Sequence, residues 1–351
     1  MLVLENASVT DIDRQTRSML PLVSRTFALG IKLLPARLEA PVRLGYLLCR
    51  IADTIEDDLV LAPERKAELL DAFLGCFDDP RQIEAFSAST NELTTHDAHD
   101  DYVDLVGATG SVLTLFRNLD LPTQAILRRW IEEMVRGMRR FVVEHPRGIR
   151  IASIAEYHQY CYFVAGTVGH LLTDLWHTHS TLIDSRVYAK LLEDCEPFGE
   201  ALQSVNILKD IAWDAQEENA IYVPAELLAA HGSGHDRILA PESRDANLAA
   251  LGPLMRVAQD DIERSLRYIE HLPLMAMRIR LFCVLPILFA VATLREIERS
   301  DTMLVPGAGV KISRSEVKSL IFAASTSTLT NYTLRWLVDR VRERPFDFSR
   351  R

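Results

Sequence analysis

Two segments of the chain place polar side chains at helical spacing on otherwise apolar stretches. The first set falls within an arc of about 60° on an α-helix and consists of Tyr46, Arg50, Asp53 and Asp57. The second set falls within an arc of about 80° and consists of Gln203, Asn206, Asp210 and Asp214. Each set contains two carboxylates one helical turn apart, and such pairs repel one another. Because an unfavourable pair of aspartates occurs on both segments, the negative charge is predicted to have a function.

Carboxylate and amide oxygens suit Mg2+, which is typically held by one or two carboxylates together with water and substrate phosphate oxygens. Two acidic faces opposed across a helical bundle would enclose a cavity in which Mg2+ links the protein to a diphosphate. The metal would then stabilise the negative charge that develops when an allylic diphosphate ionises. The alternative is that each stripe is a solvated helix face, because acidic pairs are common on amphipathic helices.

The elements that position these residues are predicted to be helices throughout, because apolar residues recur at i, i+3, i+4 and i+7 along most of the chain. Ser8, Ser153 and Ser313 each precede an acidic residue by three positions, which is a capping-box pattern. Pro63 and Pro122 suit first helical turns. We therefore predict an all-α fold.

The polar breaks between the predicted helices are short, and none resembles a flexible linker. We therefore expect a single domain over residues 1–351. His96 and His99 fall in one break, 87–100, and are predicted to lie in an exposed loop rather than at a metal. The predicted helices span residues 8–20, 24–34, 39–59, 63–77, 101–118, 122–144, 153–178, 184–195, 197–215, 224–230, 245–271, 275–299 and 313–341.

The composition favours a soluble cytoplasmic protein. A formal charge of -10, from 39 basic and 49 acidic side chains, disfavours binding to a nucleic-acid backbone. Five scattered cysteines and an N-terminus without a basic, apolar leader indicate a reducing compartment. The longest apolar run, Leu281 to Leu294, contains Pro286 and is shorter than the roughly 20 residues that span a membrane, so it predicts a buried core helix.

Four sequence blocks, taken in order, resemble the squalene/phytoene synthase superfamily. They are Val23-Ser24-Arg25-Thr26-Phe27-Ala28, Tyr46 to Asp58, Tyr160 to Gly169, and Gln203 to Asp214. Two later stretches, Phe282 to Leu294 and Gly309 to Ile312, resemble the squalene synthase branch. The resemblance implies the helical terpene synthase fold, a single-domain bundle with two aspartate-rich motifs that face each other across a central cavity.

The resemblance also implies roles for individual residues. The implied metal-site residues are Asp53, Glu56, Asp57, Asn206, Asp210 and Asp214. The implied catalytic residues are the four aspartates of that set together with Tyr160, which would lie near the carbocation. The implied substrate-binding residues are Ser24, Arg25, Phe27, Tyr46, Arg50, Gly166, Gly169, Gln203, Lys209 and Phe282. A guanidinium fork suits phosphate oxygens, which gives a physical reason for arginine in this set.

Gly166 and Gly169 lie inside a predicted helix, where each costs about 1 kcal/mol relative to alanine. Something must therefore approach the helix backbone closely. A substrate is one explanation, and tight packing against another helix is the other.

The implied reaction is head-to-head condensation of two molecules of farnesyl diphosphate with Mg2+, followed by reduction with NADPH to squalene. Lys311 and Arg314, beside a Gly/Pro turn, are the expected contacts of the NADPH phosphate. The alternative is that both are ordinary solvated charges near a helix start. We expect no nucleic-acid partner, no obligate protein partner, and transient peripheral contact with membranes.

Two other functions stay open at this point. The first is a dehydrosqualene or phytoene synthase that loses a proton and needs no NADPH, and Tyr222-x-Pro224 is nearer to the phytoene synthase form. The second is a helical scaffold without catalytic activity whose acidic faces bind cations.

Overall fold

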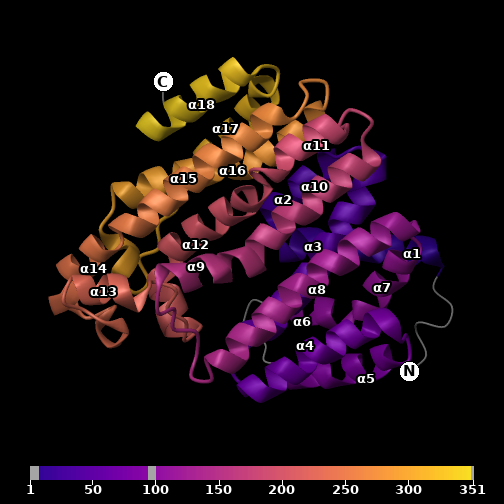
Figure 1. Cartoon of the computed structure of the whole chain (residues 1–351), viewed down its shortest axis with the longest axis horizontal. Helices are drawn as coiled ribbons and strands as arrows, with labels where there is room; N and C mark the ends of the chain where they lie inside the picture. The colour runs from indigo at the N-terminus through magenta and orange to yellow at the C-terminus, as the bar shows by residue number, and fades with distance from the viewer. Residues whose placement is uncertain (1–7, 94–99, 349–351) are drawn as a thin grey trace. The chain divides into compact units, whose positions relative to one another are not determined.

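The computed structural model describes residues 8–93 and 100–348, without the side chains of Arg25, Thr90 and Asp100 (Figure 1). The described residues form helices and connecting turns, and the only strand-like pairing among them is an isolated bridge between Arg150 and Ile221. The predicted all-α fold is confirmed. The chain divides into two compact units, of which the first contains residues 1–146 and 174–179 and the second contains the remaining residues. The expectation of one domain stays a prediction.

Unit 1 is built around α3, whose apolar sides are buried while its polar stripe stays partly open. The end of α10 belongs to this unit and is tied to α8, because Trp130 donates to Asp174 at 2.8 Å. Its elements are α1 (Val9–Val23), α2 (Arg25–Leu33), α3 (Ala36–Glu56), α4 (Pro63–Asp78), α5 (Gln82–Ser89), η1 (Thr90–Glu92), α6 (Asp100–Gly107), α7 (Thr109–Arg117) and α8 (Leu121–Glu144).

Unit 2 is built around α12, which packs against α15, α16 and the π-helical turn η2. Figure 1 shows α15, α16, α17 and α18 side by side within this unit. Its elements are α9 (Ile154–Cys161), η2 (Tyr162–Gly166), the start of α10 (Thr167–His179), α11 (Ser185–Leu192), α12 (Cys195–Glu217), α13 (Ala225–Ala230), η3 (His235–Arg237), η4 (Pro241–Ser243), α14 (Arg244–Ala250), α15 (Gly252–His271), α16 (Met277–Glu298), η5 (Thr302–Leu304), α17 (Arg314–Ser327) and α18 (Asn331–Glu343).

The three predicted capping boxes are confirmed at their N-caps. Ser8, Ser153 and Ser313 each accept a hydrogen bond from the backbone N–H three residues later, at 3.1 to 3.2 Å. Pro63 and Pro122 occupy the first turns of α4 and α8. These local signals place the helix starts because a cap satisfies backbone donors that have no partner within the helix.

Several predicted helices are interrupted, which the periodicity alone did not predict. The helix expected over 153–178 contains the π turn η2, and the one over 101–118 breaks at Ala108. The helix expected over 245–271 breaks at Leu251, and the one over 313–341 ends at Ser327 before Thr330 caps α18. Helix α5 was not predicted. Apolar residues can keep helical spacing across a break in the helix, because their spacing is set by packing against the core rather than by local hydrogen bonds.

Helix α16 contains the long apolar run and is mostly buried, as predicted for a core helix. Its 22 residues are more than the apolar run itself, so the expectation that it is too short to cross a membrane was wrong. It is the only helix in the described ranges that is long and apolar enough to cross a membrane, and 72% of its most apolar window is buried. Two fully buried arginines of this helix, Arg280 and Arg295, donate hydrogen bonds to neighbouring elements. Arg295 forms a two-pronged ion pair with Glu316 of α17, at 2.8 and 2.9 Å. Within unit 2 this helix therefore fixes the position of its neighbours.

Candidate functional site

The carboxylate of Asp53 is partly buried on the polar stripe of α3. Its side chain retains 25% of its possible exposure, and Arg50 lies 3.4 Å from it as an ion-pair partner. Burial raises the pKa of Asp53, and the nearby charge of Arg50 opposes this only in part. A nearby cation strongly stabilises the ionised form of such a carboxylate, because water solvates it poorly.

Arg50 is held by aromatic groups from two helices. Its guanidinium lies 5.9 Å from the ring centre of Tyr46 and 5.5 Å from that of Tyr102 on α6. It also donates to the Tyr46 hydroxyl at 3.4 Å. Burial lowers the pKa of Arg50, but Asp53 and Tyr46 raise it by more, so the group stays charged. Its Nε is buried and has no hydrogen-bond partner among the described residues.

Tyr102 is a residue that sequence reasoning missed. It lies outside the four blocks, and nothing in its local pattern distinguishes it from a residue on an ordinary helix face. Its contact with Arg50 arises because α6 packs against α3. Only the tertiary structure could identify it.

The other acids at the end of α3 divide into different environments. Asp57 is the C-cap of α3 and is exposed, whereas Glu56 is only 6% exposed. Asp58 accepts backbone hydrogen bonds from Val60 and Leu61 at 2.9 and 2.8 Å, which shapes the turn after the helix. Asp57 is therefore the second accessible carboxylate of this stripe, and Asp58 has a structural role.

The start of α2 lies beside the stripe of α3. Ser24 caps α2 by accepting from the Phe27 N–H at 3.2 Å, so its hydroxyl already has a structural partner. The rings of Phe27 and Tyr46 lie 5.5 Å apart, and Tyr46 donates to the Val23 carbonyl at 3.3 Å. The structure thus brings Ser24, Phe27, Tyr46, Arg50 and Asp53 together. The predicted side-chain role of Arg25 lies outside the described residues.

On the α12 stripe, the central residues are accessible to solvent and the last residue is buried. Asn206 is exposed, and Asp210 pairs with the partly exposed Lys209 at 2.9 Å. Lys209 also reaches Asn206 Oδ1, at 3.5 Å. Gln203 is partly buried, and Asp214 is only 8% exposed. The four residues share one helix face as predicted, but their access to solvent differs.

Tyr160 is paired with a second tyrosine that sequence reasoning did not include in the site. Its hydroxyl donates to that of Tyr222 at 3.1 Å, and the two rings stack with centres 4.7 Å apart. Both residues are buried. Tyr222 and Asp214 line the same small void, which links this pair to the end of the α12 stripe. The motif Tyr222-x-Pro224 was a signal that could have identified it.

The glycines of η2 and α10 lie where α12 crosses them closely. A Cβ at Gly169 would fall 1.8 Å from the Cys195 carbonyl oxygen, and one at Gly199 would fall 2.1 Å from that of Ala165. A Cβ at Gly166 would meet the Glu196 side chain at 3.0 Å. Helix packing therefore accounts for Gly169, as the alternative explanation held, while substrate contact at Gly166 and Gly169 stays a prediction.

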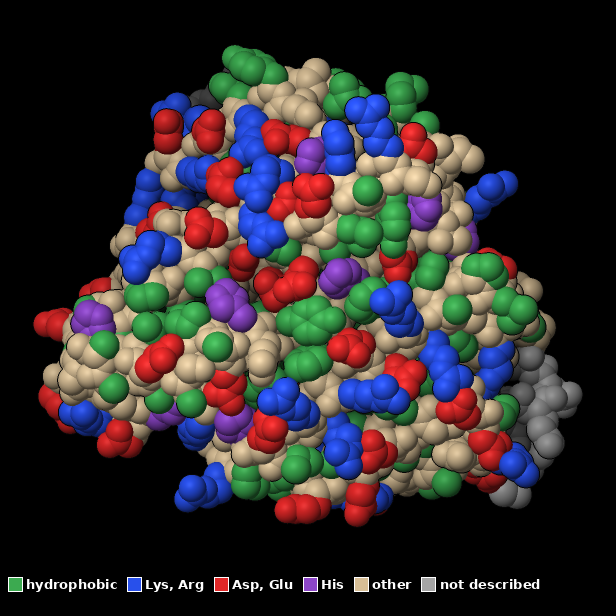
Figure 2. All heavy atoms as spheres, viewed as in Figure 1, with side chains coloured by type: hydrophobic (Ala, Val, Ile, Leu, Met, Phe, Trp, Pro, Cys, Tyr) green, Lys and Arg blue, Asp and Glu red, His purple; other side chains and the backbone are tan. Residues whose placement is uncertain are grey.

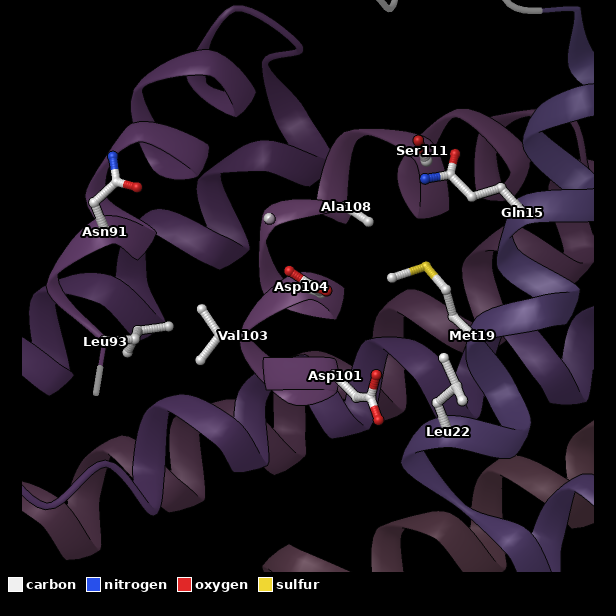
Figure 3. Close-up of a pocket in the computed structure, with 11 residues that line it drawn as sticks. Gln15, Met19, Leu22, Asn91, Leu93, Asp101, Val103, Asp104, Ala108 and Ser111 are labelled. Carbon is white, nitrogen blue, oxygen red and sulfur yellow. The ribbon is translucent and has the colours of Figure 1, made fainter. Parts of the chain in front are cut away.

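The remaining predicted residues lie on α16 and around the start of α17. Phe282 is buried in α16, and Lys311 and Arg314 are exposed near the N-terminus of α17. Residues His96 and His99 lie outside the described residues. A separate hollow of about 740 Å3 in unit 1 places Asp101 and Asp104 of α6 opposite Met19 and Leu22 of α1 (Figure 3). None of the predicted site residues lines it.

A second polar cluster is buried beside the α12 stripe. Glu200 and Asp261 are 5% and 7% exposed, and Ser204 donates to Asp261 at 3.3 Å. Burial, together with the charge of Asp261, raises the pKa of Glu200 to about 8. Burial also raises the pKa of Asp261 to about 7, against the opposing effects of Ser204 and Arg264. Sequence reasoning missed both acids because neither belongs to a recognisable motif.

Oxygen ligands for Mg2+ are available on each stripe. No group of three or more His, Cys, Asp or Glu side chains within residues 8–93 and 100–348 is arranged to hold a metal alone. Mg2+ normally needs only one or two carboxylates when phosphate oxygens complete its shell. The carboxylates of the two stripes could supply those one or two ligands. The Nε–H of Arg50, which has no partner among the described residues, could donate to a phosphate oxygen.

Comparison with solved structures identifies the class of fold. TcSQS in complex with the ligand BPH1237 superposes with a TM-score of 0.77 at 22% identity, over 95% of this chain and 98% of that one. A dehydrosqualene synthase gives a TM-score of 0.58 at 17% identity, over 95% and 96%. The protein has the all-α fold of the isoprenoid synthases.

Sequence comparison is more specific. The profile of the Squalene/phytoene synthase family matches residues 20–316, so the chain belongs to the squalene/phytoene synthase family. Squalene synthase BSS of Botryococcus braunii is 28% identical over 310 residues, which cover 88% of this chain and 63% of that protein. The squalene synthase of Schizosaccharomyces pombe is 25% identical over 338 residues, which cover 95% and 70%. The chain thus spans about two thirds of the length of these relatives.

Proposed function

We propose that the protein condenses two molecules of farnesyl diphosphate head to head and then reduces the product to squalene with NADPH. The observation that carries this proposal is the group around Arg50. A charged guanidinium lies against two tyrosine rings and is 30% exposed. It has one buried N–H donor without a partner among the described residues, beside a partly buried carboxylate. This combination suits a diphosphate accompanied by a divalent cation. Membership of the family and the names of the relatives support the same reaction class.

Each acidic stripe would supply oxygen ligands. Asp53 and Asp57 would act on α3, and Asp210, Asn206 and Asp214 on α12, with Asp214 the most enclosed. When bound, Mg2+ supplies the positive charge that stabilises the departing diphosphate. Arg50 would donate its free Nε–H to the same group, and Tyr46 and Tyr102 would keep its guanidinium oriented.

Loss of diphosphate leaves an allylic cation, the double bond of the second substrate attacks it, and loss of a proton closes the cyclopropane of presqualene diphosphate. Tyr160 would help to remove this proton. Its hydroxyl donates to Tyr222, so its oxygen lone pairs can face the proton that leaves the cation. The stacked faces of the two rings would also stabilise positive charge. Buried apolar walls, including Phe282, would exclude the water that quenches a carbocation.

NADPH supplies hydride for the second half of the reaction. Lys311 and Arg314 are both exposed, so they are free to meet its phosphates. We further propose that the protein is cytoplasmic and meets membranes only at their surface. The single-domain arrangement with a central cavity belongs to the same proposal.

The test is to incubate purified protein with labelled farnesyl diphosphate and Mg2+, with and without NADPH, and to identify the products. Presqualene diphosphate should accumulate without NADPH, and squalene should dominate with it. Formation of dehydrosqualene or phytoene at equal rates in both cases would replace the proposal with the proton-losing alternative. A complete lack of turnover would favour the cation-binding scaffold.

Lys311→Ala separates the two half-reactions. It should raise the NADPH concentration needed for squalene formation and leave the rate of presqualene diphosphate formation unchanged. The conservative variant Lys311→Arg should restore the NADPH response, because it returns the positive charge. An unchanged NADPH response in Lys311→Ala would show that this lysine is an ordinary solvated charge.

A further inference from the structure

The segment that carries Tyr222 is held against the loop before α9 by backbone hydrogen bonds. Ile221 donates to the Ile149 carbonyl at 2.9 Å, and Ile151 donates to the Ile221 carbonyl at 3.1 Å. Helix α9 follows directly on this loop and carries Tyr160. The bonds therefore fix the position of one tyrosine of the buried pair relative to the other.

The chain enters this segment through an uncommon backbone conformation at Asn219. Its φ of 47° is the only positive value at a non-glycine residue within the described ranges, 8–93 and 100–348. The turn at this residue follows the end of α12 and allows Ala220 to donate to the Asp214 carbonyl at 2.8 Å. Asparagine tolerates the left-handed region better than most residues, but it does not require it. Contacts from elsewhere are needed to hold the turn.

Arg150 supplies these contacts from the loop before α9. One guanidinium nitrogen donates to the Asn219 backbone carbonyl at 2.6 Å, and another donates to the Asn219 side-chain oxygen at 2.7 Å. The first nitrogen also donates to the Ile149 carbonyl at 2.8 Å. The Asn219 side-chain nitrogen in turn donates to the Arg147 carbonyl at 3.1 Å. We call Arg150 and Asn219, joined in this way, the clamp.

The clamp lies at the surface, although the tyrosines beyond it are buried. Asn219 is exposed and Arg150 is partly exposed. Figure 2 shows acidic, basic and histidine side chains mixed at the lower left of the view, where Figure 1 places α13 and the loop that leads into α9. Gly148 allows the close approach, because its φ is 92° and a Cβ there would lie 2.0 Å from the Asn219 carbonyl oxygen.

We propose that Arg150 is a positioning residue that acts on the reaction through Tyr222, an inference that rests on the proposed function. Two residues separate Asn219 from Tyr222, so the turn at Asn219 sets where the Tyr222 side chain lies. A displaced Tyr222 would no longer accept the hydrogen bond that orients the Tyr160 hydroxyl. Small displacements of this kind slow a reaction without weakening substrate binding.

The first test measures hydrogen–deuterium exchange of peptides that cover residues 219–223, in the absence of substrate. Arg150→Gln should make this segment exchange about tenfold faster, because the bonds on either side of Ile221 open more often. The matched control is Arg237→Gln, which also removes an arginine-to-carbonyl bond in unit 2, at 3.0 Å to Gly232. The control should leave exchange in this segment unchanged.

The second test is single-turnover kinetics with farnesyl diphosphate at saturating Mg2+. Arg150→Gln should slow formation of presqualene diphosphate about fivefold and leave KM within about twofold of wild type. In a Tyr222→Phe background, the same substitution should slow the reaction by less than about twofold, because the hydroxyl that it positions is already absent. A loop contact with no part in the reaction would leave the rate unchanged in both backgrounds.

Substitutions within the clamp separate the turn from the side-chain bond. Asn219→Asp keeps an acceptor for Arg150 and tolerates a positive φ, so its rate should stay within about twofold of wild type. Asn219→Gly keeps the turn but loses the acceptor, and its rate should fall between those of wild type and Arg150→Gln. Arg150→Lys should be nearly as slow as Arg150→Gln, because an ammonium group lacks the planar fork that reaches both oxygens.

Three results would overturn the proposal. The first is unchanged exchange of residues 219–223 in Arg150→Gln, and the second is an equal loss of rate with and without Tyr222→Phe. The third is a raised KM in Arg150→Gln with an unchanged single-turnover rate. A wild-type protein that forms no presqualene diphosphate would refute the proposed function instead, and the exchange experiment would still decide whether Arg150 holds the segment of Tyr222.

Discussion

The acidic stripes of α3 and α12 have nearly the same spacing in the sequence, yet their surroundings differ. On α3 the cation Arg50 belongs to the stripe and is clamped between Tyr46 and Tyr102. On α12 the nearest cation, Lys209, lies partly exposed beside Asp210. Arg50 and Lys209 are about equally exposed, at 30% and 29%, so the two stripes differ in the partners that hold the cation rather than in its access to water.

The charged groups that flank the two stripes differ as well. Arg43 of α3 is 1% exposed and donates to Glu39 at 3.0 Å, so that helix is anchored by paired charges. Beside the α12 stripe lie Glu200 and Asp261, whose pKa values are raised to about 8 and about 7. The packing of α12 is thus sensitive to alkaline conditions in a way that the anchor of α3 is not.

Removing one carboxylate from either stripe should have the largest effect. Asp53→Asn and Asp210→Asn should each lower kcat about a hundredfold or more, because a metal ligand is lost at the point where charge develops. Circular dichroism should report unchanged helical content, since a like-charge repulsion is also relieved. Asp339→Asn, at a site that is 67% exposed on α18, is the control. A near wild-type rate for either variant at saturating Mg2+ would remove that stripe from the site.

The pH dependence of stability should separate the two helices. Glu200 and Asp261 bind protons more tightly in the folded state, with pKa values of about 8 and about 7, than at their ordinary values of 4.5 and 3.8. Raising the pH from about 4 to about 8 therefore lowers the free energy of unfolding, because the unfolded state releases these protons at a lower pH than the folded state does. Urea unfolding at a series of pH values should show this decline.

The variant Glu200→Gln should flatten the decline, because glutamine resembles the protonated acid and does not ionise. Glu68→Gln, which changes an acid that is 65% exposed on α4, should leave the decline as in wild type. Stability that stays constant or rises between about pH 5 and pH 8 in the wild-type protein would contradict the assignment of protons to the α12 pair.

The tyrosine pair should give a smaller and more specific effect. Tyr160→Phe should slow formation of presqualene diphosphate about tenfold to a hundredfold with little change in KM, because only one hydroxyl is lost. Tyr222→Phe should have a weaker effect, since it removes the partner rather than the acting group. Single-turnover kinetics would resolve the step. If KM rises while kcat stays constant in Tyr160→Phe, the residue binds substrate and takes no part in proton movement.

The smallest effect should come from Tyr102, which positions Arg50. Tyr102→Leu should raise KM for farnesyl diphosphate about fivefold, because the ring face that holds the guanidinium is lost. Tyr102→Phe should behave like wild type, since it keeps that ring face. Equal losses in both variants would mean that the hydroxyl, rather than the ring, is what matters.

Much of this architecture could be predicted from local sequence. The stripes of α3 and α12, the caps at Ser8, Ser153 and Ser313, and the core character of α16 all follow from spacing along one helix. Helical periodicity and capping involve residues within about four positions of each other, so a single segment contains the whole signal. The order of the four blocks also indicated the family.

Tertiary structure decided which neighbours each stripe has. Tyr102 reaches Arg50 from α6, Tyr222 reaches Tyr160 from the turn before α13, and Asp261 approaches Glu200 from α15. Each of these contacts joins residues more than 50 positions apart in the chain. Solvation, and with it the pKa of a buried acid, depends on what packs around a group rather than on its neighbours in sequence. The chain therefore specifies locally where its carboxylates lie, and only the packed helices decide which of them are dry, paired or protonated.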